Sequence, residues 1–548
     1  EKRYYNSVLR ENAIYKDMQE QDESIEDLFY SKSLIATIDF EKREGYFTYK
    51  NSYGGEKTYS SIKYKTWVKQ FTWDMDKNIQ VVGHKGASPG LRFVCTKEKQ
   101  DSLQFYVPFA RFLGDDDIMY CEEVKYINTA DAKVLLDERG LVTLHTDAVI
   151  DPLENSKVEL KTDSTYHLLY DTKITIEGAK RYKGFGYYDF VNKQGEKFPV
   201  FMSEIGTNED AVSVTKGSVG EDVTFDEYFA YKGEMRIKNG RQLLEYNGGA
   251  RMIHTAKNGP TGYVRFNSVV DPQRVMIPIE EKITNWPKDE IHRNFFMRKD
   301  SCHTYSSFIE SRKDHSDIEM LRAEGYLYHN NIFDRFDITT KDKIAKADTV
   351  GTIMSFIPSE NAITGFGLID LGVMMSAGKP IEFVTAGNIR DDRTTNTITL
   401  NTLMRMDFFL DRGLVTKLYD MITMSDAPKC DSMYSSFEHR MREYVDTAGY
   451  NYIMSHRSLP LEEVVVKKGE APIKALPEDG SIFTFDNVDM LWSTPKKAYI
   501  CDTTVNLMLM RDRSVNRKVR LQSEFVVRKS GSYVDMVITA DNDTWIYI

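Results

Sequence analysis

The chain has 548 residues, of which 41% are hydrophobic and 28% charged, and its formal net charge is −11. This length allows roughly three or four domains of ordinary size and more than one buried core. The acidic balance argues against nucleic acid as a partner, and without a run of about 18 apolar residues we expect no membrane-spanning segment.

The cysteines do not fix the compartment of the protein. The chain has five, an odd number, and no two of them form a C-x-x-C pair. They suit neither a disulfide framework nor a zinc site, so their disulfide state stays open. They are Cys95, Cys121, Cys302, Cys430 and Cys501.

The first 34 residues have the spacing of a helix. Tyr4, Val8, Tyr15 and Met18 recur at roughly helical intervals, and the range contains neither Gly nor Pro. We therefore expect an N-terminal helical segment over residues 1–34.

Both ends of the chain look like cuts. The first residue is Glu1 rather than Met, and the last residues, Thr544 to Ile548, form a strand-like run. We expect the chain to be a piece of a longer protein.

From residue 35 the pattern becomes that of strands. Runs such as Ile35 to Phe40, Tyr46 to Tyr49 and Thr66 to Phe71 alternate apolar and polar residues, which is typical of strands with one buried face. The pattern predicts a β domain over residues 35–120.

Strand-like runs dominate residues 121–255, with almost no helix between them. They recur roughly every 8–12 residues and are separated by turn residues such as Asp137 to Gly140 and the hairpin signal Asn239-Gly240. No repeat of fixed length emerges. The spacing is typical of sandwiches, barrels and solenoids rather than of alternating β and α units, and it predicts a serial-strand β domain.

The C-terminal half mixes strands with a few helices. We expect a mixed connecting region over 256–350, in which Ser316 to Gly325 has the features of a short capped helix. A β sheet with a helical hairpin is expected over 351–458, and a C-terminal β domain over 459–548, which begins with a proline-containing linker.

The helical hairpin near 411–449 is predicted from caps and apolar faces. Asp411 is expected to cap its first helix, and Asp431 or Ser432 its second, which would end at Gly449. The expected apolar face of the first helix consists of Leu414, Val415, Leu418, Met421 and Ile422. The overall prediction is a mainly β protein with several stacked or packed β-sheet domains of sandwich, jellyroll or solenoid-like type, plus this hairpin and the N-terminal helix.

The sequence predicts no catalytic residue, metal ligand or cofactor-binding residue, and we lean against an enzyme. It has no P-loop, nucleophile elbow or H-E-x-x-H motif. Gly184-Phe185-Gly186 and Gly365-Phe366-Gly367 are incomplete as dinucleotide fingerprints, and we interpret them as bulges or close sheet packing.

Several clusters have a structural interpretation that we prefer to a chemical one. Asp314 to Asp317 is read as a helix cap and Asp541 to Asp543 as a turn. Adjacency of Cys302 and His303 does not establish a catalytic dyad. Five basic residues are interpreted as a solvated strand or turn: Arg511, Arg513, Arg517, Lys518 and Arg520.

Carbohydrate chemistry stays open as an alternative. A glycosidase needs two carboxylates in a cleft, and nothing singles out a pair from candidates such as Asp115, Glu122 and Asp370. Aromatic side chains can stack on sugars, although we favour core or cross-strand packing for those in strands. The candidates are Trp67, Trp73, Tyr187 and Tyr188.

Four pieces of the chain together resemble large β-rich cell-envelope proteins of the Bacteroidota kind. They are residues 124–132, 182–190, 363–372 and 544–548. The strands from Val124 onward also resemble the β-jellyroll of lipopolysaccharide-transport proteins, by fold-level analogy. Either resemblance implies a periplasmic or outer-membrane-associated place.

Three functions follow as hypotheses. The first is a non-enzymatic envelope scaffold or binding protein with protein partners, part of a larger chain or complex. The second is a carbohydrate-binding or carbohydrate-active protein on a β scaffold, with a glycan as ligand. The third is a lipid-transport jellyroll.

Overall fold

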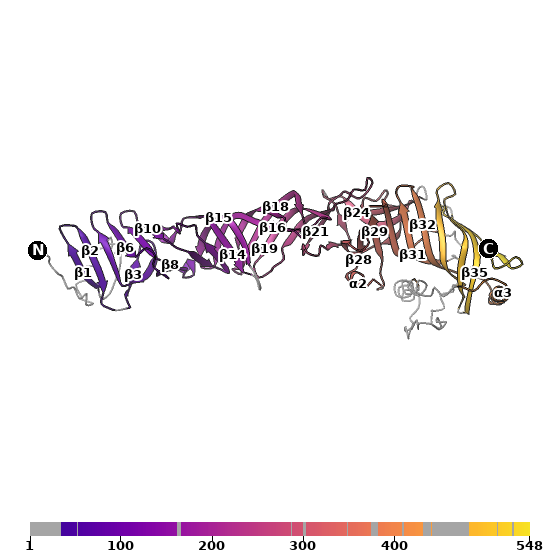
Figure 1. Cartoon of the computed structure of the whole chain (residues 1–548), viewed down its shortest axis with the longest axis horizontal. Coiled ribbons are helices and arrows are strands. Elements are labelled where there is room, and N and C mark those ends of the chain that lie inside the picture. The colour runs from indigo at the N-terminus through magenta and orange to yellow at the C-terminus, as the bar shows by residue number, and fades with distance from the viewer. Residues whose placement is uncertain are drawn as a thin grey trace. The chain divides into compact units, whose positions relative to one another are not determined.

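The computed structural model describes residues 34–51, 53–161, 166–286, 288–299, 303–347, 349–373, 382–407, 410–430, 440, 482–511, 513–528 and 531–548. The described chain forms two compact units. Unit 1 extends to Val223 and includes Tyr231–Gly248 and Val269–Gln273, and unit 2 comprises Thr224–Ala230, Gly249–Ser268 and the residues from Arg274 onward. Antiparallel strands make up most of both units (Figure 1), so the prediction of a mainly β protein is confirmed.

In the described part of unit 1, seven strands form one antiparallel sheet, in the order β1-β2-β5-β6-β9-β10-β13. Their bounds are β1 Leu34–Asp39, β2 Glu44–Tyr49, β5 Gln70–Asp74, β6 Ile79–Gly83, β9 Phe109–Leu113, β10 Ile118–Glu122 and β13 Val142–Leu144.

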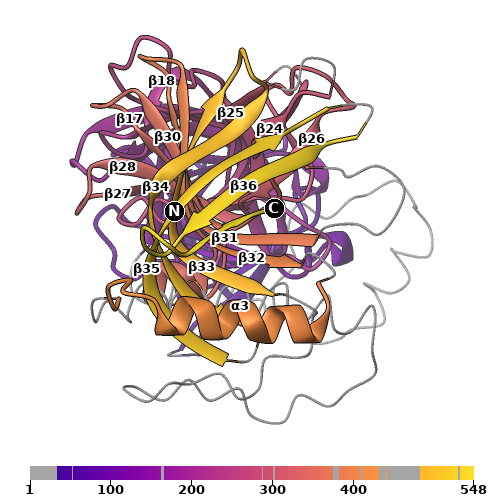
Figure 2. The same cartoon turned by 90° about the vertical axis from the view of Figure 1, so that its right-hand side faces the viewer.

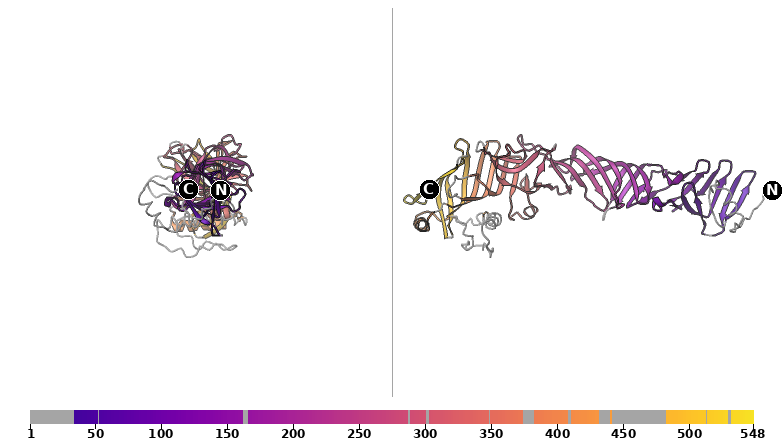
Figure 3. Two further views of the ribbon diagram at one scale, coloured as in Figure 1. Left: turned by 90° about the vertical axis from the view of Figure 1, so that its left-hand side faces the viewer. Right: turned by 180° about the vertical axis from the view of Figure 1, so that it is seen from behind.

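A second sheet of unit 1 follows the order β3-β4-β7-β8-β11-β12-β14-β15-β16-β17-β18. Its strands are β3 Gly55–Tyr59, β4 Tyr64–Val68, β7 Leu91–Cys95, β8 Gln104–Val107, β11 Tyr126–Thr129, β12 Ala132–Leu135, β14 Leu153–Lys161, β15 Tyr166–Gly178, β16 Arg181–Val191, β17 Lys197–Thr207 and β18 Ser213–Thr224. Short 3-10 turns lie at Glu98–Gln100 and Thr146–Ala148. Figure 3 shows these strands side by side from behind, in indigo to magenta.

The first strands of unit 1 enter the two sheets in alternating pairs. β1 and β2 belong to one sheet, β3 and β4 to the other, and the alternation continues to β13. The sheets pack face to face, since Tyr59 of β3 contacts Phe112 of β9, with 5.0 Å between ring centroids. The core of this region lies between the two layers, so the outer face of each sheet is left to solvent.

Lys57 is the unusual member of this core. Its side chain is fully buried, and its Nζ donates to Gln80 Oε1 across the two layers at 2.7 Å. The same Nζ lies 3.7 Å from the centroid of the Phe71 ring. Burial lowers the pKa of Lys57 well below its ordinary value, because a charged amine loses its hydration there.

From β14 the strands of unit 1 become long. β15 and β16 pair with two register shifts, and β16 and β17 with one between Gly184 and Gly186. A Cβ at Gly184 would lie 2.1 Å from the Lys173 carbonyl oxygen, so only glycine fits. The interpretation of Gly184-Phe185-Gly186 as a bulge with close sheet packing is confirmed.

Three further strands have residues assigned to both units. They are β19 Phe229–Lys238, β20 Glu245–Met252 and β21 Val264–Val269. Gly240, in the turn between β19 and β20, has a φ of +80°, as the Asn-Gly hairpin signal predicts.

In the described part of unit 2, twelve strands form a sheet in the order β22-β27-β28-β29-β30-β31-β32-β33-β34-β35-β36-β37. Their bounds are β22 Ile277–Ile279, β27 Gly325–Asn330, β28 Arg335–Thr339, β29 Ile353–Ile357, β30 Ala362–Ile369, β31 Glu382–Asp392, β32 Thr397–Asp407, β33 Phe483–Ser493, β34 Ala498–Met510, β35 Arg513–Val526, β36 Tyr533–Thr539 and β37 Trp545–Tyr547. A smaller sheet contains β23 Ile283–Thr284, β24 Glu290–Met297, β25 Thr304–Glu310 and β26 Ile318–Arg322. A short helix, α2, spans Lys341–Ala345.

The first helix of the predicted hairpin is present as α3, Arg412–Met424, which lies next to β35 (Figure 2). Asp411 caps it as predicted, since its Oδ1 accepts from Gly413 N at 2.7 Å. The buried face is narrower than expected: Val415, Leu418 and Ile422 are buried, whereas the predicted members Leu414 and Met421 are nearly half exposed.

The basic residues of β35 lie on a strand, as predicted, and Arg513 and Arg520 are exposed, whereas Arg517 is half-buried. Arg517 donates to the carbonyls of Thr423 and Ala427, both at 2.8 Å, and so holds the C-terminal end of α3. Arg520 bonds to Asp502 at 3.0 Å, and Arg513 lies over the Tyr419 ring.

The predicted helix over Ser316 to Gly325 is wrong. Ile318–Arg322 is strand β26, and it pairs with β24 through the register Phe295↔Leu321. Met320 and Leu321 are both buried because a bulge interrupts the strand alternation there. Pairing with an existing strand outweighs the local helical propensity of this segment.

Other predictions fall outside the described residues. These are residues 1–33 of the N-terminal segment, the second helix of the hairpin and its caps Asp431 and Ser432, and the linker from Leu459 to Ile473. Of the hairpin's second half, only Arg440 is described, and it pairs with Asp486 at 2.9 Å. The bounds of the six predicted domains stay predictions.

Candidate functional site

The outer face of the second sheet of unit 1 carries a line of aromatic side chains. In β8 the burial pattern alternates strictly, so Phe105 and Val107 point into the core while Gln104 and Tyr106 face solvent. The same alternation in β4 turns Trp67 outward, and in β11 it turns Tyr126 outward.

The strand register brings these side chains into one row. Arg92 of β7 pairs with Tyr106, and the neighbouring registers Thr66↔Phe93 and Ile127↔Phe105 place Trp67 beside Arg92 and Tyr126 beside Tyr106. The exposed fractions are 39% for Trp67, 47% for Tyr106 and 39% for Tyr126. We call Trp67, Tyr106 and Tyr126 the aromatic row.

The aromatic row crosses four neighbouring strands. Three strand spacings amount to about 14 Å, which is long enough for several consecutive rings of a polymer. At its Tyr106 and Tyr126 end lies a groove of about 690 Å³. Its walls include Gln104 and Asn128 from the sheet and Ser88 and Pro89 from the loop after β6. This volume is in the range of small-ligand sites.

Charged groups surround the aromatic row, and most of them are paired. Lys65 bonds to Glu56 at 3.3 Å, and Lys133 bonds to Glu159 at 3.4 Å. These lysines also lie over the rings of the row, with Nζ 5.4 Å from the Trp67 centroid for Lys65 and 4.8 Å from the Tyr126 centroid for Lys133. Their charges are therefore largely balanced within the sheet face.

Arg92 differs from these lysines. Its Nε and Nη2 both donate to the neutral oxygen Gln104 Oε1, at 2.9 and 2.6 Å. The guanidinium carbon lies 5.8 Å from the Trp67 ring centroid, a cation–π distance. Among the described residues no carboxylate forms an ion pair with Arg92.

The four aromatic candidates from the sequence have different surroundings. Trp67 and Tyr187 are each 39% exposed, whereas Trp73 is half-buried and donates to Asn78 Oδ1 at 3.1 Å. The Tyr188 hydroxyl contacts His167 Nδ1 at 3.1 Å, and burial raises the pKa of Tyr188 to about 12. Trp73 and Tyr188 are therefore structural.

Tyr187 belongs to a second exposed aromatic group. Its ring stacks on Tyr170 of β15, with 6.0 Å between centroids, and tilts against Phe201 of β17. Phe185 and Phe201 are each 44% exposed. Cross-strand packing, the favoured interpretation, is confirmed for Tyr187, because its ring contacts both neighbouring strands.

The three carboxylate candidates have ordinary structural partners. Asp115 accepts from Asn78, and Asp370 of unit 2 accepts from the backbone of Gly372. Burial raises the pKa of Glu122, but hydrogen bonds from Lys85 and Arg111 outweigh it and hold the pKa below its ordinary value. A lowered pKa is the opposite of what a general acid needs.

The acidic clusters form turns. Asp314 accepts from Ser316 N at 2.8 Å, in a turn before strand β26 rather than as the predicted helix cap. Asp541 accepts from the backbones of Asp543 and Thr544, so its interpretation as a turn is confirmed. His303 lies in unit 2, where burial lowers its pKa, and Cys302 lies outside the described residues.

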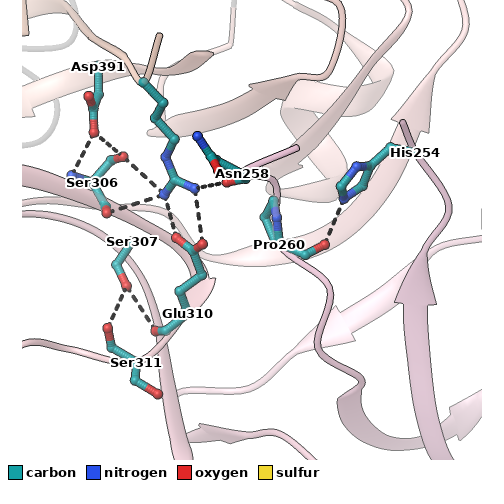
Figure 4. A network of polar contacts seen from close by, with 9 residues as sticks. His254, Asn258, Pro260, Ser306, Ser307, Glu310, Ser311 and Asp391 are labelled. Carbon is teal, nitrogen blue, oxygen red and sulfur yellow. Dashed lines mark hydrogen bonds and ion pairs between the residues drawn. The ribbon is translucent and has the colours of Figure 1, made fainter. Parts of the chain in front are cut away.

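Unit 2 has a polar cavity of about 430 Å³, and Figure 4 shows the network of polar contacts formed by some of its lining residues. Both carboxylate oxygens of Glu310, in β25, accept hydrogen bonds from Arg393. Arg393 Nη1 also donates to the Asn258 carbonyl at 2.8 Å. Asp391 accepts from the backbone and hydroxyl of Ser306. We call these five residues the arginine cluster. The charge of Arg393 is matched by Glu310 within the cluster, which is the arrangement of a structural clamp.

Sequence reasoning missed Tyr106, Tyr126 and Arg92. The sequence contains a signal for one of them. Tyr106 lies two residues after the polar Gln104, so in a strand with one buried face both side chains point outward. That spacing shows that Tyr106 is exposed. It does not show that it lies beside a residue of another strand.

In the part of the chain that the structure describes, no helix is long and apolar enough to cross a membrane. Likewise, no three His, Cys, Asp or Glu side chains among the described residues converge as metal ligands. Comparisons with protein-family models, curated proteins and solved structures find no match to this chain.

Proposed function

We propose that this chain is a non-enzymatic binding scaffold of the cell envelope, and that its aromatic row holds a glycan. The observation that carries the proposal is the alignment of Trp67, Tyr106 and Tyr126, all exposed, across consecutive strands beside a groove. The place in the envelope rests on the sequence resemblance alone.

A glycan suits this row for a physical reason. The faces of aromatic rings carry partial negative charge, and the C–H groups on one face of a pyranose carry partial positive charge, so the two stack. Hydroxyl groups at the edge of the sugar need polar partners, and the groove supplies the side-chain amides of Gln104 and Asn128. Strands hold these groups at fixed spacing, which lowers the entropic cost of binding.

Two alternatives have less support. A lipid conduit needs a continuous apolar interior, whereas the space between the sheets of unit 1 is occupied by fully buried side chains that include Lys57 and Tyr59. A carbohydrate-active enzyme needs a carboxylate pair with one raised pKa, and Glu122 has a lowered one.

The test is glycan binding by the full chain and by single-ring variants. A glycan array identifies a ligand, and calorimetry then compares the wild type with Trp67→Ala, Tyr106→Ala and Tyr126→Ala. We expect each variant to weaken binding about tenfold, since one stacked ring is worth about 1.4 kcal/mol.

The matched control is Tyr533→Ala in unit 2, where the ring is 38% exposed and lies outside the row. It should bind as tightly as the wild type. An array without hits, or equal losses in all four variants, would refute the proposal.

A further inference from the structure

The charges around the aromatic row select among glycans. Four lysines on this sheet that point away from its core are each paired with a carboxylate: Lys65 with Glu56, Lys133 with Glu159, Lys173 with Glu154 and Lys183 with Glu177. A ligand would have to displace a carboxylate to use any of these four amines.

Arg92 needs no such displacement. A guanidinium has five N–H donors, and two of those on Arg92 are used by the single neutral oxygen of Gln104. The side chain is exposed and sits within the row, between Trp67 and Tyr106 in the strand register. Arg92 thus lies on the same face as the three rings, and three of its five donors are not used by Gln104.

The orientation of Arg92 is also fixed before a ligand arrives. The bonds to Gln104 hold one edge of the guanidinium, and the Trp67 ring lies 5.8 Å away. A planar fork held in this way matches the two oxygens of a carboxylate. Lys125 adds a second exposed cation on the wall of the groove, where Glu123 is engaged by the backbone N–H of Gly86 at 2.7 Å.

From this arrangement we infer that the row takes an acidic glycan, with pyranose rings stacked on Trp67, Tyr106 and Tyr126 and a uronate carboxylate bound by Arg92. This inference rests on the proposed function, because it names the class of glycan for the same site. The net charge of −11 by itself predicts the opposite preference, because it would repel a polyanion.

The experiment uses two ligands with the same sugar backbone: oligogalacturonate, which is charged, and its fully methyl-esterified form, in which a methyl ester replaces each carboxylate. Calorimetry with the full chain should show about tenfold tighter binding of the acid than of the ester at low salt. The difference should shrink as NaCl is raised, because salt screens an exposed ion pair.

Variants assign the effect to Arg92. In Arg92→Gln the preference for the acid should be lost, so that the variant binds acid and ester with about equal affinity. Arg92→Lys keeps the charge and loses the fork, so its affinity for the acid should lie between those of the wild type and Arg92→Gln. Arg520→Gln, at another exposed arginine, serves as the control and should bind like the wild type.

Each other outcome overturns a specific claim. Equal affinity of the wild type for acid and ester would refute the acidic preference and leave glycan binding intact. Binding of dextran sulfate but not of oligogalacturonate would replace the carboxylate by a sulfate ester. Failure to bind acid, ester or any array glycan would refute the proposed function itself.

Discussion

Arg92 in unit 1 and Arg393 in unit 2 are the same side chain in opposite surroundings. Arg393 is 14% exposed and is held by both oxygens of Glu310, with further bonds to backbone carbonyls. Arg92 is exposed and meets a single neutral oxygen. The comparison teaches that two arginines near cavities can differ in availability: the charge of Arg393 is already paired within the fold, whereas that of Arg92 is not paired with a carboxylate among the described residues.

The cavities beside the two arginines lead to the same conclusion. The cavity of unit 2 is lined by Ser306, Glu310 and Asp391, whose polar atoms bond to one another or to Arg393 (Figure 4). The groove of unit 1 has aromatic rings on one wall and Gln104 and Asn128 beside them. The first arrangement pairs its polar groups internally, and the second has exposed groups that we propose bind a glycan.

The largest expected effect concerns the arginine cluster of unit 2. Glu310→Gln removes the charge that pairs with Arg393, so a nearly buried guanidinium is left uncompensated. We expect the free energy of unfolding of unit 2 to fall by about 2–3 kcal/mol, measured by urea denaturation. The matched control is Glu360→Gln, which breaks the exposed pair with Arg390 and should cost less than about 1 kcal/mol. Equal losses in the two variants would contradict the distinction.

Lys57 sharpens the comparison, because its amine is fully buried in the core of unit 1 and bonds to the neutral oxygen of Gln80. Its pKa is lowered by burial, so between that pKa and 10.5 the unfolded chain binds more protons than the native chain. The free energy of unfolding should therefore rise with pH across this window, with a slope of up to about 1.4 kcal/mol per pH unit. Below the lowered pKa of Lys57, the destabilisation caused by burying this amine should have its full value.

The double variant Lys57→Met/Gln80→Leu tests this, because it removes the amine and the amide that bonds to it. Its unfolding free energy, measured between pH 7 and 10.5, should lack the rise seen in the wild type. Lys65→Met, at an exposed and paired lysine, is the control and should retain the rise. A wild-type curve that is flat in this range would mean that Lys57 keeps an ordinary pKa.

Arg517 is an intermediate case, bound by backbone carbonyls at the end of α3. Arg517→Met removes two charge-assisted hydrogen bonds that are partly buried. We expect the local unfolding free energy of α3 to fall by about 1–2 kcal/mol, measured by amide hydrogen exchange. The exchange of strands in unit 1 should be unchanged, and slowed exchange in α3 would contradict the assigned role.

The smallest effect is expected at Arg92 itself. Arg92→Gln should change the unfolding free energy of unit 1 by no more than about 0.5 kcal/mol, since the side chain is exposed and has no charged partner. Urea denaturation is again the measurement. A loss comparable to that of Glu310→Gln would make Arg92 structural and would remove its availability to a ligand.

Sequence patterns recover much of the fold but only part of the candidate site. The Asp411 cap of α3 and the Asn-Gly turn at Gly240 are local features, and both are present. Residue type and strand position single out Trp67 as a candidate. Tyr106 and Tyr126 are not singled out, because 39 residues separate Trp67 from Tyr106 and 20 separate Tyr106 from Tyr126 along the chain.

The sequence by itself determined the strands, their turns and which side chains alternate, because these depend on neighbours a few residues apart. Only the tertiary structure decided how the strands pair and so which side chains meet. The segment Ile318–Arg322 became a strand because β24 offered it hydrogen bonds. Trp67, Arg92, Tyr106 and Tyr126 form a line because strand pairs alternate between two sheets, an arrangement set by long-range packing that no local pattern encodes.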